Sequence, residues 1–248
     1  FDLMEKINSQ AGKFGAEFVS EEAAGPLISK NGLITLNSNT PRTYTARALI
    51  IATGAVPKRL GIKGEDEFYG KGVSTCATCD GPLFKNKEVV VIGGGDSAVG
   101  EAIYLTRFAG KVTLIHRRDG LRASKVLADR LLGMKKAEVK WSRVPLEITG
   151  RDRVSGIKIR NLKTDKEEEI PAQGIFIYAG VKPNTDFLGG KLKLDEGGFI
   201  VTDELMRTSL PGIFACGDVR KNALKQVVTA CAEGAQAAFS CRHYLEGF

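Results

Sequence analysis

The chain has 248 residues, with 36 lysine or arginine and 29 aspartate or glutamate residues, and a formal net charge of +7. Its composition, 43% hydrophobic and 26% charged, is that of a folded globular protein, which excludes a disordered chain and a miniprotein held by disulfides. No stretch approaches the roughly 18 uninterrupted apolar residues of a membrane span, and residues 1–10 lack a signal-peptide pattern, so we expect a cytoplasmic protein without a membrane partner.

The N-terminal quarter of the sequence predicts one helix followed by short strands. A helix is expected over residues 5–16. Turn-forming Gly, Asn and Pro residues separate the apolar runs that follow, which favours strands there. These predicted strands cover residues 17–19, 27–29, 33–36 and 48–52, and the last of them ends at Thr53-Gly54.

Five cysteines are spread along the chain, and only Cys76 and Cys79 lie close together. Their C-x-x-C spacing suits either two ligands of a structural zinc site or a short redox disulfide. Zinc would need two further ligands, and the chain offers no second C-x-x-C and only two histidines, so no metal is expected. Asp80 directly follows Cys79 and could move the proton that a dithiol gains and loses. This favours a redox pair over two inert cysteines.

A dinucleotide-binding unit is predicted in the middle of the chain. The β-rich run 88–92 leads into three glycines, a helix over 97–108 and a second strand over 111–115. Strand, glycine-rich turn, helix and strand within about 30 residues form the βαβ unit that binds dinucleotides.

The glycine-rich turn has the pattern G-x-G-x-x-A, beginning at Gly93. In such a turn the first glycine permits the sharp bend, and the second, Gly95, lets the backbone approach a pyrophosphate. The small Ala98 lets the helix pack near the strand. Asp96 follows the glycines and Ser97 begins the predicted helix, whose N-terminus would face the phosphates.

The end of the second strand indicates which dinucleotide binds. An NAD site would place Asp or Glu there to accept a hydrogen bond from the ribose 2′-hydroxyl. This chain instead has His116, Arg117 and Arg118, followed by Arg122. These basic residues suit a 2′-phosphate, so NADP(H) is predicted. The same role explains the basic patch, and no aromatic residues are interleaved with it, so no nucleic-acid partner is expected.

The second half of the chain predicts further alternation of helices and strands. The run 163–169, rich in Lys and Glu, is interpreted as a solvated hairpin tip. Helices are expected over 124–135 and 226–245. Strands are expected over 143–149, 154–161, 169–170, 174–180 and 212–216, the last ending at Gly217-Asp218.

Three segments carry a family resemblance. CATCDG at 76–81, GGGDSA at 93–98 followed by HRRDGLRAS, and GIFACGD at 212–218 followed by KQVVTACAEGAQAA occur in this chain in that order. The chain resembles the low-molecular-weight thioredoxin reductases, which depend on FAD and NADPH, over essentially its whole length. The resemblance implies an α/β fold of two Rossmann-like three-layer ββα domains. An FAD domain (1–59 and 185–248) would be interrupted by an NADPH domain with the redox disulfide (60–184).

The resemblance also implies roles for individual residues. Cys79 is similar to the cysteine that meets the flavin, Cys76 to the cysteine that attacks the protein substrate, and Asp80 to the acid/base. The residues similar to FAD-binding positions are Thr53 and Gly54 at the crossing between domains, Gly217 and Asp218 beside the ribityl and pyrophosphate groups, and Gln226 and Val227 near the isoalloxazine.

One departure from the family pattern concerns the start of the chain. The family begins with its own strand, G-x-G-x-x-G turn and helix, which hold the ADP half of FAD, and no such unit precedes Phe1. We therefore expect the first βαβ unit of the FAD domain to be missing and the sequence to be an N-terminally truncated reductase.

The implied function is that of a homodimeric thioredoxin-disulfide reductase. Electrons would pass from NADPH through FAD and the pair Cys76 and Cys79 to thioredoxin or a similar small redox protein. Two alternatives stay open. The flavoprotein subunit of an alkyl hydroperoxide reductase system shares the fold and the C-x-x-C-D pattern, and a non-catalytic NADPH-binding module would need no FAD.

Overall fold

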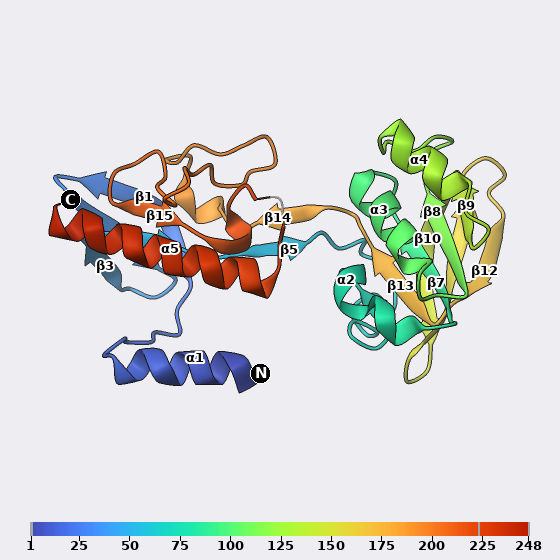
Figure 1. Cartoon of the computed structure of the whole chain (residues 1–248), viewed down its shortest axis with the longest axis horizontal. Coiled ribbons are helices and arrows are strands. Elements are labelled where there is room, and N and C mark those ends of the chain that lie inside the picture. Colours follow the sequence, from blue (N-terminus) through green and yellow to red (C-terminus); the bar gives the residue numbers. More distant parts are fainter. Residues whose placement is uncertain (1, 223, 248) are drawn as a thin grey trace. The chain divides into compact units, whose positions relative to one another are not determined.

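The computed structural model describes residues 2–222 and 224–247. The chain divides into two compact units, of which unit 1 comprises Phe1–Val56 and Lys182–Phe248, and unit 2 comprises Pro57–Val181. Unit 2 is therefore inserted into the sequence of unit 1 (Figure 1). Because this division says nothing of which cofactor each unit binds, the assignment of an FAD domain and an NADPH domain stays a prediction.

The centre of unit 2 is a five-stranded parallel sheet with the strand order β6-β13-β7-β8-β9. The five strands are β6 (Val73–Ser74), β7 (Glu88–Ile92), β8 (Lys111–His116), β9 (Ala137–Trp141) and β13 (Gly174–Ile177). The inner strands β13, β7 and β8 are rich in Val and Ile and are buried on both faces, as expected where both faces of a parallel sheet are covered. The edge strand β9 is only partly buried.

Helices cover one face of this sheet (Figure 1). They are α2 (Ala77–Asp80), the 3-10 helix η1 (Gly81–Phe84), α3 (Asp96–Leu105) and α4 (Lys125–Leu132). Val89 and Val91 of β7 point to this face and pack with Val99 and Leu105 of α3. Since side chains alternate along a strand, their neighbour Val90 points to the opposite face.

A three-stranded antiparallel sheet covers the other face. It consists of β10 (Arg143–Gly150), β11 (Val154–Asn161) and β12 (Glu167–Pro171). Ile148, Ile157 and Ile159 of this sheet share a buried cluster with Val90 and Ile175 of the parallel sheet. Unit 2 thus has the predicted three layers, two sheets and one layer of helices.

Unit 1 is built from shorter pieces. An antiparallel sheet contains β1 (Ala23–Lys30), β2 (Leu33–Ser38) and β3 (Thr43–Ala46), and β4 (Leu49–Ile51) pairs in parallel with β15 (Ile213–Ala215). Unit 1 also contains the helices α1 (Asp2–Lys13) and α5 (Val227–Glu246) and the 3-10 helices η2 (Asp186–Leu188) and η3 (Gly217–Val219). No helix within the described ranges is long and apolar enough to cross a membrane.

The two segments that connect the units pair as a two-stranded ribbon. Its strands are β5 (Ala55–Pro57) and β14 (Val181–Pro183). Next to the ribbon, Thr53 Oγ1 donates to the carbonyl of Asn184 at 2.8 Å, and Asn184 Nδ2 donates to the carbonyl of Thr53 at 2.8 Å. The backbone N–H of Asn184 also donates to the Gly54 carbonyl at 3.0 Å. Gly54 has φ +67°, a backbone conformation that suits glycine.

Several predicted elements differ from the structure. The strand predicted over 17–19 does not form, because this run has no pairing partner among the described residues, and Phe18 is 62% exposed. Helix α3 ends at Leu105, whereas the sequence predicted an end at Phe108. Directly after Leu105, the Thr106 hydroxyl donates to the Ile103 carbonyl at 2.6 Å and so competes with the backbone hydrogen bonds of the helix.

The hairpin tip predicted over 163–169 is also too long. Residues 167–169 belong to β12, where Glu167 lies opposite Arg160 and Glu169 opposite Lys158. Opposite charges on directly facing strand positions favour this pairing, so the turn is confined to 162–166.

Truncating a buried side chain of the parallel sheet should destabilise unit 2. Leu114 in β8 is 1% exposed, so Leu114→Ala should lower the free energy of unfolding by about 2–5 kcal/mol. The single tryptophan, Trp141 in β9, lies in unit 2, so its fluorescence in a urea titration follows this unit. The control Val126→Ala, at a side chain 78% exposed, should change stability by less than about 0.5 kcal/mol. Equal effects of the two substitutions would contradict the assigned layers.

Candidate active site

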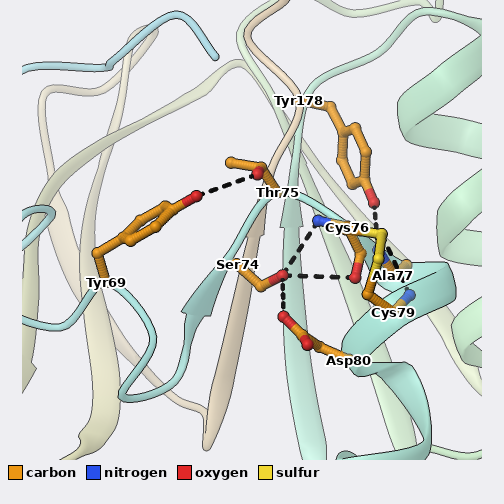
Figure 2. Close-up of a disulfide and its surroundings, with 8 residues drawn as sticks. All are labelled: Tyr69, Ser74, Thr75, Cys76, Ala77, Cys79, Asp80 and Tyr178. Carbon is orange, nitrogen blue, oxygen red and sulfur yellow. Dashed lines mark hydrogen bonds between the residues drawn. A yellow bond between two sulfur atoms is a disulfide. The ribbon is translucent and has the colours of Figure 1, made fainter. Parts of the chain in front are cut away.

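Cys76 and Cys79 form a disulfide at the start of the short helix α2 (Figure 2). Cys76 is the N-cap residue, so a single helical turn separates the two sulfurs and holds the Cα atoms 5.3 Å apart. The Cys79 backbone amide donates to Cys76 Sγ at 3.1 Å. Cys79 is exposed and Cys76 half-buried. An exposed disulfide whose sulfur receives a backbone hydrogen bond is suited to exchange with another thiol, since a donor at this position stabilises a thiolate.

The other three cysteines are unpaired. Burial raises the pKa of the Cys216 and Cys241 thiols, which disfavours their reactive thiolate forms. Cys231 is exposed on α5. The redox chemistry of the chain is therefore concentrated at the C-x-x-C pair.

Asp80, the predicted acid/base, is held by a serine that the sequence analysis missed. Ser74 Oγ, at the end of β6, donates to Asp80 Oδ2 at 2.6 Å and accepts from the Cys76 amide at 3.0 Å (Figure 2). Ser74 is only 6% exposed. A small hydroxyl residue two positions before a reactive cysteine is a local turn signal that could have drawn attention to it.

A tyrosine from a distant part of the sequence also contacts the disulfide turn. Tyr178 Oη accepts from the Ala77 amide at 2.9 Å (Figure 2). Burial, and secondarily the nearby charge of Glu101, raise the pKa of the Tyr178 hydroxyl. Burial also raises the pKa of Glu101, whose Oε2 is buried without a hydrogen-bond partner among the described residues. Through its hydrogen bond with the Ala77 amide, Tyr178 fixes the backbone directly after Cys76.

The glycine-rich turn forms between β7 and α3, where glycine is required for two separate reasons. A Cβ on Gly93 would come within 2.6 Å of the Ala98 side chain, and Gly93 has φ +155°. A Cβ on Gly94 would collide with the imidazole ring of His116. The turn therefore packs tightly against both the helix and β8, while Gly95 caps α3 with its backbone extended.

His116 lies behind this turn. It is 5% exposed, and its Nδ1 lies 2.9 Å from the Gly93 carbonyl and its Nε2 3.1 Å from the Gly120 carbonyl. Burial lowers the pKa of the imidazole. The ring thus connects the glycine turn to the basic loop that follows β8, residues 117–124. Its predicted contact with a 2′-phosphate stays a prediction.

The basic loop is fastened to the glycine turn by further hydrogen bonds. The Arg122 amide donates to the Gly94 carbonyl at 2.7 Å, and the Ser124 amide donates to Asp96 Oδ1 at 2.7 Å. Asp96 therefore orients the loop through its carboxylate. The guanidinium-bearing residues Arg117, Arg118 and Arg122 remain exposed on this loop.

A cavity of about 330 Å³ opens beside the glycine turn, entirely within unit 2. Gly94, Arg117, Arg122 and Arg143 contribute to its lining, together with Tyr178. The sequence analysis did not identify Arg143, because β10 reaches this cavity only through the stacking of the two sheets. A glycine-lined backbone and several guanidinium groups fit a nucleotide with phosphates, as NADPH requires.

The residues predicted to bind FAD all lie in unit 1, and four of them lie in η3 or at the start of α5: Gly217, Asp218, Gln226 and Val227. Gly217 has φ +73°, and its backbone amide donates to Glu233 Oε2 at 2.7 Å. The other carboxylate oxygen, Glu233 Oε1, forms an ion pair with Arg220 at 2.6 Å. The Asp218 carbonyl accepts from Lys225 Nζ at 2.9 Å. These contacts fix the turn that carries Asp218 against the helix.

At the start of α5 itself, Gln226 and Thr229 form a reciprocal capping box. Val227 is 61% exposed and Val228 72% exposed at the beginning of this helix. Two exposed apolar side chains beside the turn of Asp218 fit the flat, apolar ring of a flavin. The residues that unit 1 provides therefore fit the flavin end of FAD.

A disulfide next to a carboxyl group, in one unit with a basic glycine-rich turn, defines a pyridine-nucleotide-dependent disulfide oxidoreductase. The family profile "Pyridine nucleotide-disulphide oxidoreductase" matches residues 8–234 of this chain. The chain therefore belongs to this family, and the relatives below belong to its thioredoxin reductase branch.

Individual relatives are similar along almost the whole chain. A thioredoxin reductase from Listeria innocua is 47% identical over 247 residues, which are 99% of this chain and 76% of the relative. The structure of thioredoxin reductase from Streptococcus pyogenes is 44% identical with a TM-score of 0.92, covering 100% of this chain and 80% of that one. The corresponding values for thioredoxin reductase from Giardia duodenalis are 39%, 0.91, 99% and 81%. These likenesses confirm the predicted fold class and family, whose cofactors are FAD and NADPH.

Adding a methyl group at Gly94 should weaken binding of the nucleotide. The Cβ of Gly94→Ala would displace the His116 ring and with it the link between the turn and the basic loop. We expect the dissociation constant for NADP⁺, measured by isothermal titration calorimetry, to rise about tenfold or more, equivalent to about 1.4 kcal/mol. Gly100→Ala is the matched control, because no atom lies within 4 Å of its added Cβ. Unchanged binding in Gly94→Ala would contradict the role given to the turn.

Proposed function

We propose that the chain reduces a disulfide on thioredoxin or a similar small redox protein, using electrons from NADPH that pass through FAD and the Cys76–Cys79 disulfide. The observation that carries this proposal is the disulfide at α2, with Asp80 beside it, at the same edge of the parallel sheet as the glycine-rich turn. The names of the relatives from Listeria innocua and Streptococcus pyogenes support thioredoxin as the substrate.

The reduction of Cys76–Cys79 adds two electrons and two protons and produces two thiols. FAD, when bound, supplies the transfer of an electron pair from NADPH to this disulfide. Asp80 lies within the same helical turn as Cys79, and its carboxylate accepts a hydrogen bond from the Ser74 hydroxyl. It can therefore deliver and accept one of the protons. The Cys79 amide, 3.1 Å from Cys76 Sγ, favours the thiolate of Cys76.

The reduced pair then transfers its electrons to the substrate. The Cys76 thiolate attacks one sulfur of the substrate disulfide, which releases the second substrate sulfur as a thiolate and forms a mixed disulfide. Cys79 next attacks Cys76 Sγ, which restores the Cys76–Cys79 bond and releases the reduced substrate. Each step exchanges one thiolate for another and therefore needs no further oxidant.

NADPH binding is assigned to the glycine turn and the basic loop. The backbone of Gly93, Gly94 and Gly95, with Ser97 and Ala98 in the first turn of α3, would hold the pyrophosphate. Arg117, Arg118 and Arg122 would bind the 2′-phosphate through charge-assisted hydrogen bonds. His116 and Asp96 support this loop from behind, as their contacts with backbone groups of the turn and loop indicate.

FAD binding is assigned to unit 1, with the same residues that the family resemblance implies. Asp218 and Gly217 would lie beside the ribityl and pyrophosphate groups, and Gln226 and Val227 near the isoalloxazine. The hydrogen bonds of Thr53 and Gly54 with Asn184 support a structural role at the crossing between the units.

The proposal includes a homodimer, on the basis of the family resemblance, and keeps the cytoplasmic location that is expected from the sequence. The positive charge of the basic loop is assigned to the phosphate of NADPH rather than to nucleic acid.

The function can be tested with the whole chain supplied with FAD, NADPH and thioredoxin. Cys79→Ser should lower the rate of NADPH oxidation that depends on thioredoxin by at least about a hundredfold, or about 2.7 kcal/mol in the barrier. Cys231→Ser, at an exposed and unpaired cysteine, is the control and should retain the rate of the unchanged chain. An unchanged rate in Cys79→Ser would contradict the proposed function.

A further inference from the structure

The Ser74 hydroxyl occupies a special position between the acid/base and the reactive cysteine. Ser74 is the last residue of β6, and its backbone is paired in register with Phe176 of β13. Its side chain is nearly completely buried, with 6% exposed. In Figure 2 the hydroxyl lies between the Asp80 carboxylate and the backbone of Cys76. A buried hydroxyl that is fixed by a sheet is well placed to control the position of its partners.

Three polar groups surround the hydroxyl oxygen. Asp80 Oδ2 lies at 2.6 Å, the Cys76 amide nitrogen at 3.0 Å and the Cys76 carbonyl oxygen at 3.4 Å. A hydroxyl has one hydrogen to donate and two lone pairs that accept. Because the Cys76 amide is itself a donor, the hydroxyl hydrogen is left for the carboxylate or the carbonyl. The shorter distance and the negative charge favour the carboxylate when Asp80 is ionised.

The same three contacts can serve the protonated form of Asp80. In that form the carboxyl hydrogen on Oδ2 is donated to Ser74 Oγ. The hydroxyl hydrogen of Ser74 then turns toward the Cys76 carbonyl, the remaining acceptor at 3.4 Å. The Cys76 amide holds the oxygen of Ser74 in both arrangements. Because the hydroxyl both donates and accepts, it can stay hydrogen-bonded to Asp80 Oδ2 whether this oxygen is ionised or carries the proton.

We propose that Ser74 is a positioning residue for the proton that Asp80 exchanges with the Cys76–Cys79 pair. Reduction of the disulfide by two electrons, which NADPH and FAD would supply, breaks the S–S bond and leaves two sulfur anions. One proton moves from the Asp80 carboxyl to one sulfur, and the resulting carboxylate accepts the hydroxyl hydrogen of Ser74. The second proton comes from solvent. This inference rests on the acid/base role of Asp80 in the proposed function.

The inference is tested on the whole chain without added FAD, by following the reduction of Cys76–Cys79 by dithiothreitol. Samples are quenched with an alkylating reagent, and the two labelled cysteines are quantified by mass spectrometry. Because positioned acid/base groups contribute about a hundredfold or more, we expect Ser74→Ala to slow the reduction about tenfold. Ser74→Thr keeps a hydroxyl on a strand and should recover the rate to within about twofold.

Tyr69→Phe is the matched control, because it removes a neighbouring hydroxyl whose contact, at 3.5 Å, is with Thr75 Oγ1 (Figure 2). It should leave the rate unchanged. Trp141 fluorescence during urea unfolding shows whether each variant retains a folded unit 2. If Ser74→Ala does not fold, the comparison of Ser74→Thr with Ser74→Val, which fills the same space without a hydroxyl, replaces it.

A double-mutant cycle with Asp80→Asn separates positioning of Asp80 from a merely structural effect. If Ser74 acts through Asp80, the double variant Ser74→Ala/Asp80→Asn should be as slow as Asp80→Asn alone. Additive effects of the two substitutions would overturn the inference. A slow Asp80→Asn together with an unchanged Ser74→Ala would overturn the inference and leave the proposed function intact. An unchanged Asp80→Asn would contradict the acid/base role on which both depend.

Discussion

The parallel pairing of β6, β13, β7 and β8 is the constraint on which the site depends. Because these strands run in the same direction, their carboxyl ends lie at one edge of the sheet. That edge carries Ser74 at the end of β6, Tyr178 just after β13, Gly93 just after β7 and His116 at the end of β8. The disulfide turn and the nucleotide-binding turn are therefore built by neighbouring strands of a single unit.

Within this edge, β13 lies between β6 and β7, so its continuation reaches both turns. Tyr178 contacts both turns, because its hydroxyl accepts from the Ala77 amide and the residue lines the cavity beside Gly94. A similar indirect role belongs to His116, which holds the glycine turn and the basic loop together through two backbone carbonyls. Side chains that hydrogen-bond to the backbone of the two turns therefore fix much of the geometry of the site.

The features that could be predicted from the sequence are those coded by neighbouring residues. The unit of strand, glycine turn, helix and strand was predictable because Gly93 meets a local steric demand, since a Cβ there would collide with Ala98. The C-x-x-C pair was predictable because two cysteines one helical turn apart can bond. Ser74 and Tyr178 were not found, although for different reasons. The signal of Ser74, a hydroxyl residue two positions before Cys76, is local and was overlooked, whereas Tyr178 lies 101 residues from Ala77, and only the strand order brings the two together.

Cys76 and Cys79 are expected to form the single reversible disulfide of this chain, and alkylation followed by peptide mass mapping can measure this pairing. The purified chain is labelled as obtained, after reduction by dithiothreitol, and after removal of the reductant and reoxidation. We expect both residues to be protected at first, to gain labels together on reduction and to lose this reactivity together on reoxidation, while Cys231 is labelled throughout. Labelling of Cys76 or Cys79 in the oxidised chain, or reversible protection of other cysteines instead, would contradict it.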